Sequence, residues 1–171
     1  MPRKNASLIS QKRILHVLGS LYESARECSN EAWSDTFTQM ADMFSSGPGS
    51  LSLISAEDDS VDFIATTYSR ECLGLLDTRF RDINPIYKKV VQTPVGKTFW
   101  RVRDCPDQEF INTEFYQDLL RKENVYDIRY FKLCDHSGLA GGVSFSRPRS
   151  KPTFSSSRSA VSTKRGNSKR R

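Results

Sequence analysis

Residues 82–120 read DINPIYKKVVQTPVGKTFWRVRDCPDQEFINTEFYQDLL and hold six of the eighteen aromatic residues (ten Phe, six Tyr, two Trp) of this 171-residue chain. Pro85 and Pro94 interrupt the stretch, and the residue before a proline avoids helical backbone angles. We therefore expect a folded-over aromatic cluster made of several short elements. These elements are a helical turn over residues 86–91, a strand over 97–102 and a helix that restarts at Cys105-Pro106-Asp107.

The last part of this stretch has the apolar period of a helix. Ile111, Phe115 and Leu119 recur at intervals of four, and Tyr116 and Leu120 widen the same face. The pattern predicts one helix that covers part of a core.

Upstream of this stretch, the pattern predicts three helices and a hairpin. The first helix has apolar residues at Ile14, Leu18, Leu21, Ala25 and Cys28, with Val17 beside them. Ser29 offers a cap for the second helix, whose apolar face is Trp33, Phe37, Met40 and Phe44. Residues 51–55 and 61–67 then form a hairpin, and Leu73, Leu76 and Phe80 fit one more helical face.

Downstream lies the clearest hairpin of the chain. Residues 128–134 and 139–146 flank Asp135-His136-Ser137-Gly138, which suits a type I turn. In the second strand one face carries only small residues, Ala140, Gly142, Ser144 and Ser146, so another element or a ligand can approach the backbone closely there. The fold class is α+β, with an antiparallel sheet of about five strands flanked by helices.

Charge divides the chain into a body and a tail. The formal net charge is +6, but residues 147–171 hold nine Lys or Arg and no acid, which leaves seventeen bases and twenty acids in residues 1–146. The tail has too few apolar residues to offset the entropy of ordering. We expect a frayed N-terminus over residues 1–11, one domain over 12–147 and a disordered tail over 148–171.

The sequence favours a soluble, cytoplasmic binding protein over an enzyme. No apolar run reaches the ~20 residues that span a bilayer, and four widely spaced cysteines indicate free thiols. His16 and His136 have no partner at metal or triad spacing, and no phosphate-binding loop or nucleophile elbow is present. We expect no catalytic residue, no metal and no cofactor.

Several short strings, in their order and spacing, resemble the N-terminal sensor region of LuxR-family transcriptional regulators, which has a GAF- or PAS-like fold. The resemblance covers about residues 12–155, roughly 85% of the chain. The strings are Tyr22-Glu23-Ser24-Ala25, Ala32-Trp33, Asp82-Ile83-Asn84-Pro85, Pro94-Val95-Gly96, residues 113–120, and Ser144-Phe145-Ser146-Arg147 with Phe154-Ser155.

The resemblance implies a regulatory domain that binds a ligand or a partner and passes its state to a DNA-binding module. Such regulators continue with a helix-turn-helix, whereas a serine-rich and basic run follows Ser155 here. The expectation is a sensor domain truncated before its DNA-binding half, by a shifted reading frame for example.

The resemblance also implies a pocket between the sheet and the helices that cross it, suited to a small apolar ligand. A plain aromatic core accounts for the same spacing, so both interpretations remain. Tyr87, Trp100 and Tyr116 favour a site because each carries a polar group that needs a partner when buried. The candidate covering residues are Phe80, Tyr87, Phe99, Trp100, Phe115 and Tyr116, and the candidate sheet floor is Phe131, Val143 and Phe145.

Two further partners follow from the sequence. The apolar stripe of the first helix can pair with a second copy of the chain as a homodimer. The basic tail can hold phosphates, which makes a nucleic-acid-associated protein the alternative function. Its candidate residues are Lys164, Arg165, Lys169, Arg170 and Arg171.

Overall fold

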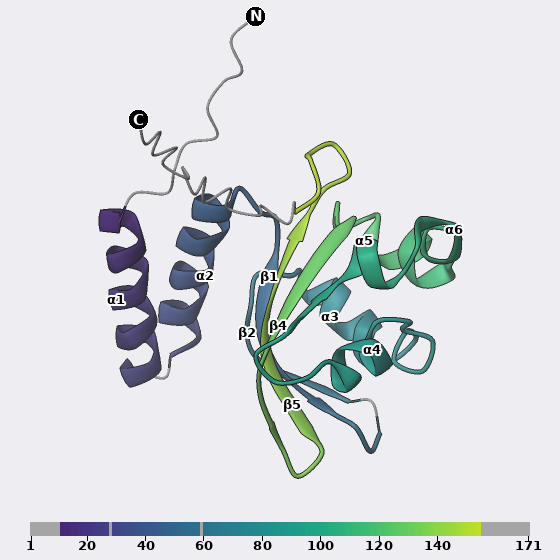
Figure 1. Ribbon diagram of the computed structural model, residues 1–171, viewed down its shortest axis with the longest axis horizontal. Coiled ribbons are helices and arrows are strands. Elements are labelled where there is room, and N and C mark those ends of the chain that lie inside the picture. Colours follow the sequence, from purple (N-terminus) through teal and green to yellow (C-terminus); the bar gives the residue numbers. More distant parts are fainter. Residues whose placement is uncertain (1–10, 28, 59, 155–171) are drawn as a thin grey trace, which may run out of the picture.

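The computed structural model describes residues 11–154, apart from residues 28 and 59. Its centre is a five-stranded antiparallel sheet in the order β2-β1-β5-β4-β3, with helices on both faces (Figure 1). The predicted α+β class is therefore confirmed.

The strands are β1 (Gly49–Ser55), β2 (Val61–Thr66), β3 (Thr98–Trp100), β4 (Asp127–His136) and β5 (Leu139–Arg147). The helices are α1 (Gln11–Glu27), α2 (Asn30–Phe44), α3 (Arg70–Asp77), α4 (Tyr87–Gln92), α5 (Arg101–Asp104), α6 (Asp107–Phe110) and the π-helix η1 (Phe115–Leu120). In the described part of the chain, no helix is both long enough and apolar enough to cross a membrane.

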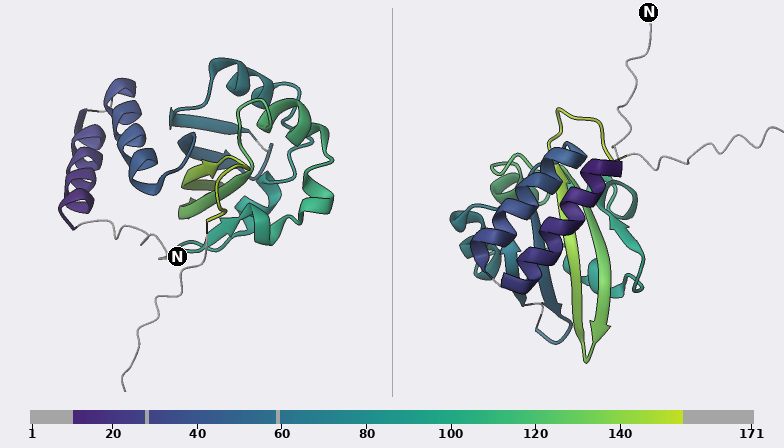
Figure 2. Two further views of the ribbon diagram at one scale, coloured as in Figure 1. Left: turned by 90° about the horizontal axis from the view of Figure 1, so that it is seen from above. Right: turned by 90° about the vertical axis from the view of Figure 1, so that its left-hand side faces the viewer.

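One face of the sheet is covered by α2, and α1 lies outside α2 (Figures 1 and 2). As predicted, Ser29 caps α2, its side chain accepting a hydrogen bond from the Ala32 amide at 3.1 Å. The predicted face of α2 packs on the sheet, where Phe37 is buried beside Phe145.

The apolar stripe of α1 does not face α2. Ser24 Oγ donates to the Ala32 carbonyl at 2.8 Å and lies 2.9 Å from Thr36 Oγ1, and Ser20 Oγ donates to Gln39 Oε1 at 3.1 Å. Val17 is the one large apolar side chain buried in this seam among the described residues of α1. Ile14 and Leu18 of the predicted stripe therefore remain exposed.

Both predicted hairpins are present, although the second turn differs in type. Ser137 and Gly138 have φ of 50° and 80°, so the turn between β4 and β5 has two left-handed residues. That is the type I′ geometry, not the predicted type I, and it matches the twist of paired strands better. Its consequence is a long β4–β5 pair at the centre of the sheet, whose register shifts once, between Lys132 and Cys134.

The small face of β5 admits a tyrosine from β4. A Cβ atom at Gly142 would lie 2.4 Å from Tyr130 Cζ, so only glycine leaves room for this ring. Tyr130 OH donates to the Ala140 carbonyl at 3.2 Å. The predicted close approach to the β5 backbone is thus made by Tyr130, which lies flat across β5.

The opposite face of the sheet is covered by α3, α4, α6 and η1 (Figure 1), and here the predicted single helix after Pro106 is wrong. Thr113 Oγ1 donates to the Phe110 carbonyl at 2.7 Å and accepts from the Tyr116 amide at 3.2 Å. This side chain ends α6 and starts η1, because a threonine hydroxyl competes with the backbone for the same bonds.

The predicted strand over 97–102 is shorter than expected. Asp104 Oδ2 accepts from the Trp100 amide at 2.7 Å, and the Cys105 amide donates to the Arg101 carbonyl at 2.8 Å. These bonds turn the chain into α5 directly after Trp100.

Residues 148–154, predicted to belong to the tail, lie against the sheet. The Phe154 amide donates to Asp127 Oδ2 at 2.8 Å, and Arg129 Nη2 donates to the Phe154 carbonyl at 2.7 Å. The Arg147 guanidinium stacks over the Phe154 ring, 4.0 Å from its centroid. The folded part therefore extends to Phe154. Of the N-terminus that was predicted to fray, Gln11 is the first residue of α1, and residues 1–10, like the rest of the tail, lie outside the described residues.

We expect Gly142→Ala to destabilise the fold by about 1–3 kcal/mol, because the new methyl group overpacks against Tyr130 and the Phe131 carbonyl. Gly74→Ala is the matched control: nothing lies within 4 Å of its Cβ position in α3, so helix propensity should stabilise it by about 0.5–1 kcal/mol. Urea unfolding measures both. Equal effects of the two substitutions would contradict the close approach of Tyr130.

Candidate ligand-binding site

A cavity of about 80 Å³ lies between the sheet and the segments that cover it. Its lining is largely apolar, and none of the described residues that line it is charged. The floor comes from the strands: Ser50, Ser52, Ile54, Val61, Phe63, Ile128, Tyr130 and Ser144. The roof comes from α3, α4, η1 and the loops beside them: Tyr68, Leu76, Asn84, Ile86, Tyr87, Val90, Phe115 and Leu120.

The floor carries a small cluster of hydroxyl groups. Ser50 Oγ and Ser144 Oγ lie 2.8 Å apart, on the neighbouring strands β1 and β5. Tyr68 reaches down to the hydroxyl groups of Ser144 and Ser146, and Tyr130 interacts with Ser52. Each buried hydroxyl thus has a partner, which it needs in an apolar environment.

The roof adds an amide and a third phenol. Asn84 Oδ1 accepts from the Ile86 amide at 2.9 Å, which holds the start of α4, and Asn84 also interacts with Tyr87. Burial raises the pKa of the Tyr68, Tyr87 and Tyr130 phenols, so all three remain protonated donors at physiological pH. The cavity therefore offers neutral donors and acceptors inside an apolar wall.

The π-turn of η1 decides which residues reach the cavity. Phe115 and Leu120, five residues apart, both line it. In an α-helix of 3.6 residues per turn, they would point roughly 140° apart. The wider turn, seen in the 2.8 Å bond from the Arg121 amide to the Tyr116 carbonyl, brings both to one side.

Two of the nine predicted pocket residues, Tyr87 and Phe115, line the cavity. Phe80, Phe99 and Tyr116 are buried in the surrounding core and do not line it. These three residues are part of the hydrophobic core, as the alternative interpretation of the aromatic spacing expected.

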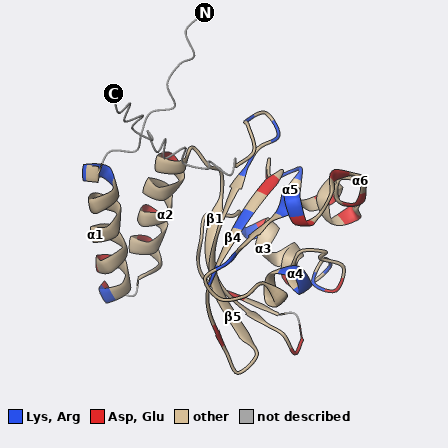
Figure 3. Ribbon diagram, in the orientation of Figure 1, with Lys and Arg blue, Asp and Glu red and all other residues tan. Residues whose placement is uncertain are grey.

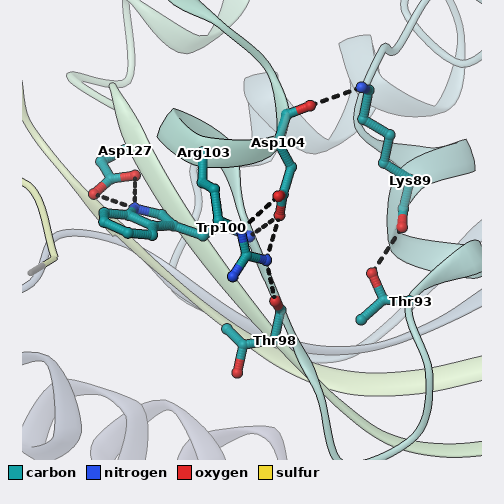
Figure 4. Close-up of polar contacts among 7 residues, drawn as sticks. All are labelled: Lys89, Thr93, Thr98, Trp100, Arg103, Asp104 and Asp127. Atoms are coloured by element: carbon teal, nitrogen blue, oxygen red, sulfur yellow. Dashed lines mark hydrogen bonds and ion pairs between the residues drawn. The ribbon is translucent and has the colours of Figure 1, made fainter. Parts of the chain in front are cut away.

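Trp100 does not line the cavity, and its indole lies beside Asp127 instead (Figure 4). Its indole Nε1 donates to both carboxylate oxygens of Asp127, at 3.0 and 3.1 Å, and the Arg129 guanidinium lies 4.1 Å from the ring centroid. The polar group that suggested a ligand site is thus used to hold β3 to β4.

The predicted floor residues lie on the wrong face of the sheet. Phe145 packs on α2, with Val143 beside it, and Phe131 pairs with Val143 and is 42% exposed. Successive strand residues point to opposite faces, so the cavity face carries Tyr130 and Ser144 instead. The floor thus combines serines with apolar and aromatic side chains of the other face, and none of the three predicted floor residues belongs to it.

Sequence reasoning also missed Ser50, Ser52 and Asn84. Alternating serines in a strand otherwise made of leucine and isoleucine were a usable signal, because a buried serine face needs polar partners. Asn84 was interpreted only as a helix stop before Pro85.

The predicted nucleic-acid residues Lys164, Arg165, Lys169, Arg170 and Arg171 lie outside the described residues. In the described part of the chain, no three His, Cys, Asp or Glu side chains gather closely enough to hold a metal ion.

No family model matches this chain, and no curated protein sequence matches it significantly. Solved structures do match. The ligand-binding domain of VqsR from Pseudomonas aeruginosa superposes with a TM-score of 0.63 at 16% identity, over 78% of this chain and 79% of that one. CepR2 from Burkholderia cenocepacia superposes with a TM-score of 0.59 at 14% identity, over 86% of this chain and 84% of the CepR2 chain.

The chain has the fold of a LuxR-type ligand-binding domain. SdiA from Escherichia coli agrees, with a TM-score of 0.59 at 16% identity, over 84% of this chain and 59% of the SdiA chain. The LuxR-type resemblance inferred from short strings is therefore confirmed for the fold.

The reactivity of three cysteine thiols tests which parts of this LuxR-type fold are buried. Burial, reinforced by the nearby charges of Glu123 and Glu71, raises the pKa of the Cys72 thiol to about 12. Burial also raises the pKa of Cys105, whereas Cys134 is exposed. Because the thiolate is the reactive form, iodoacetamide at about pH 8 should alkylate Cys134 and leave Cys72 and Cys105 unmodified.

Peptide mapping by mass spectrometry measures this difference, and urea-unfolded protein, in which all three should react alike, is the control. Alkylation of Cys72 as fast as Cys134 in the folded protein would show that α3 does not cover the sheet.

Proposed function

We propose that this protein is a regulatory sensor domain that binds a small, uncharged and largely apolar molecule between the sheet and its roof, without converting it. The observation that carries the proposal is the apolar cavity, whose floor bears hydroxyl groups and whose described lining residues are all uncharged. Transferring a charged ligand into such a site would require desolvation that no counter-charge offsets. A neutral ligand meets hydroxyl and amide partners instead.

The structural relatives support this ligand class. CepR2 is described as an N-acylhomoserine lactone dependent LuxR family transcription factor, and SdiA has been solved in complex with octanoyl-rac-glycerol. The octanoyl group of that glycerol ester is an apolar chain on an uncharged polar head. By analogy, we propose regulation of transcription as the process in which the domain acts.

The size of the cavity adds a condition. At about 80 Å³ it is well below the ~300–1,000 Å³ of typical small-molecule sites. The roof consists of short segments, among them the six-residue α4 and η1, joined by loops. A ligand larger than a few heavy atoms therefore enters only as these segments move outward from the sheet.

A cavity-filling substitution tests the site. Val90 of α4 lines the cavity and its neighbour Val91 packs at the edge of the core without lining it. We expect octanoylglycerol at 100 times its dissociation constant to stabilise the protein by about 2.7 kcal/mol. Val90→Ile should keep the fold and lose most of this gain, while the matched control Val91→Ile should retain it.

Thermal unfolding with and without the ester measures both variants. The proposal fails if the wild-type protein is not stabilised by octanoylglycerol or by homologous neutral esters, or if Val90→Ile responds like Val91→Ile.

We also propose that α1 pairs with α1 of a second copy. Ile14, Leu15, Leu18 and Tyr22 are 40–71% exposed and form one continuous stripe on a helix whose inner seam is mostly polar. Solvation of such a stripe is unfavourable. A second copy is the simplest cover, because a two-fold interface uses the same patch twice.

The charges beside the stripe favour an antiparallel pair. Lys12 stands near the start of α1 and Glu23 near its end, on the same side of the stripe. With the two-fold axis at Leu18, Leu18 packs on itself, Tyr22 packs on the partner's Ile14, and Lys12 approaches the partner's Glu23.

Leu18→Glu should convert the dimer to a monomer, because it puts two carboxylates at the two-fold axis. Leu133→Glu is the matched control, since Leu133 on β4 is similarly exposed, at 59% against 54% for Leu18. Sedimentation velocity at several concentrations measures the mass. A wild-type protein that is monomeric at high concentration, or a Leu18→Glu variant that stays dimeric, would refute the pair.

A further inference from the structure

A second and larger hollow, of about 710 Å³, runs along β3 at the edge of the sheet, on the far side of α4 from the cavity. Figure 3 shows Lys and Arg gathered on α4, α5 and the adjoining part of β4. We call this hollow the edge groove. Its charged lining residues are Lys89, Lys97, Arg103, Arg129 and Asp104.

The charge of the edge groove contrasts with that of the body. Four cations and one acid line it, whereas residues 1–146 together hold seventeen bases and twenty acids. Cations gathered in a hollow of a mildly acidic protein focus a local positive potential there.

Asp104 neutralises one of these cations and fixes its position (Figure 4). Its carboxylate accepts from Arg103 Nε at 2.6 Å and from Arg103 Nη2 at 2.8 Å. Arg103 Nη2 also donates to the Thr98 carbonyl at 2.9 Å, which covers the free edge of β3. The pKa of Asp104 is held below its usual range, first of all by Arg103, so this pair remains ionised and locked.

Three cations are left without a carboxylate of their own in the groove. Lys89 Nζ donates to the backbone carbonyl of Asp104 at 2.7 Å, which positions the ammonium without neutralising it. Within the described part of the chain, the Lys97 side chain forms no hydrogen bond or ion pair. Arg129 stacks on Trp100, and the carboxylate of nearby Asp127 is occupied by the Trp100 indole and the Phe154 amide.

These cations come from three sides of the groove, namely α4, the loop before β3, and β4. Phosphate groups suit such an arrangement, because their oxygens accept hydrogen bonds in several directions at once. We propose that the edge groove binds a small phosphorylated molecule that carries at least two negative charges. The groove is local and the surrounding body is acidic, which disfavours a long nucleic acid at this place.

α4 gives the site a connection to the cavity. Tyr87 and Val90 of α4 line the cavity, and Lys89 and Gln92 of the same helix line the groove. An anion that holds Lys89 therefore also restrains the roof of the cavity, which makes the edge groove an effector site for the proposed sensor.

Calorimetric titration of the full-length protein with pyrophosphate, at fixed ionic strength, tests the proposal. The double variant Lys89→Gln/Lys97→Gln should bind about tenfold more weakly or worse, because it removes two charge-assisted contacts. The matched control Lys122→Gln/Lys151→Gln removes the same charge from exposed lysines outside the groove and should change the affinity by less than about twofold.

A third variant separates the groove from the basic tail. Replacing Lys164, Arg165, Lys169, Arg170 and Arg171 with glutamine should leave pyrophosphate affinity unchanged within about twofold. If this variant no longer binds pyrophosphate, the tail and not the groove holds the anion. The proposal is also overturned if the wild-type protein does not bind pyrophosphate, if the control pair weakens binding as much as the groove pair, or if only oligonucleotides bind. Urea unfolding checks that each variant folds.

Discussion

The absence of a side chain at Gly142 is the constraint on which the rest of the domain depends. It lets the Tyr130 ring lie flat against β5, where its hydroxyl donates to the Ala140 carbonyl. The sheet surface beneath α4 and η1 therefore leaves space for the cavity. Because successive strand residues point to opposite faces, Phe145 of β5 lies on the other face of the sheet, where it packs on α2. One face of the sheet is therefore closed by large apolar side chains, while the other retains a space lined by hydroxyl groups.

The cations of the domain serve two different purposes. Arg129 and Arg147 hold residues 148–154 on the sheet by stacking on Trp100 and Phe154 and by donating to backbone carbonyls. Arg103 is paired with Asp104 and covers the edge of β3. Among the described residues, Lys89 and Lys97 have no carboxylate partner, and together with Arg129 they give the edge groove its surplus positive charge.

Local signals in the sequence predicted local structure well. The cap at Ser29, the face of α2, both hairpins and the short α4 follow from residues close together in the chain, whose preferences the tertiary structure does not override. The choice of sheet face could not be derived in this way. Phe131, Val143 and Phe145 form a plausible floor until the pairing shows which face the helices cover. The division of the predicted helix at Thr113 and the serine seam of α1 likewise depend on contacts with distant segments.

The central claim is that a ligand enters on the hydroxyl-lined face of the sheet and leaves the α2 face unchanged. Methyl NMR during titration with octanoylglycerol tests it most directly, because Ile54 and Ile86 line the cavity while Leu51 and Val143 pack toward α2. The account predicts saturable shifts of the Ile54 and Ile86 methyl groups, with Leu51 and Val143 nearly unmoved. Shifts confined to Leu51 and Val143, or to the exposed stripe of α1, would contradict it.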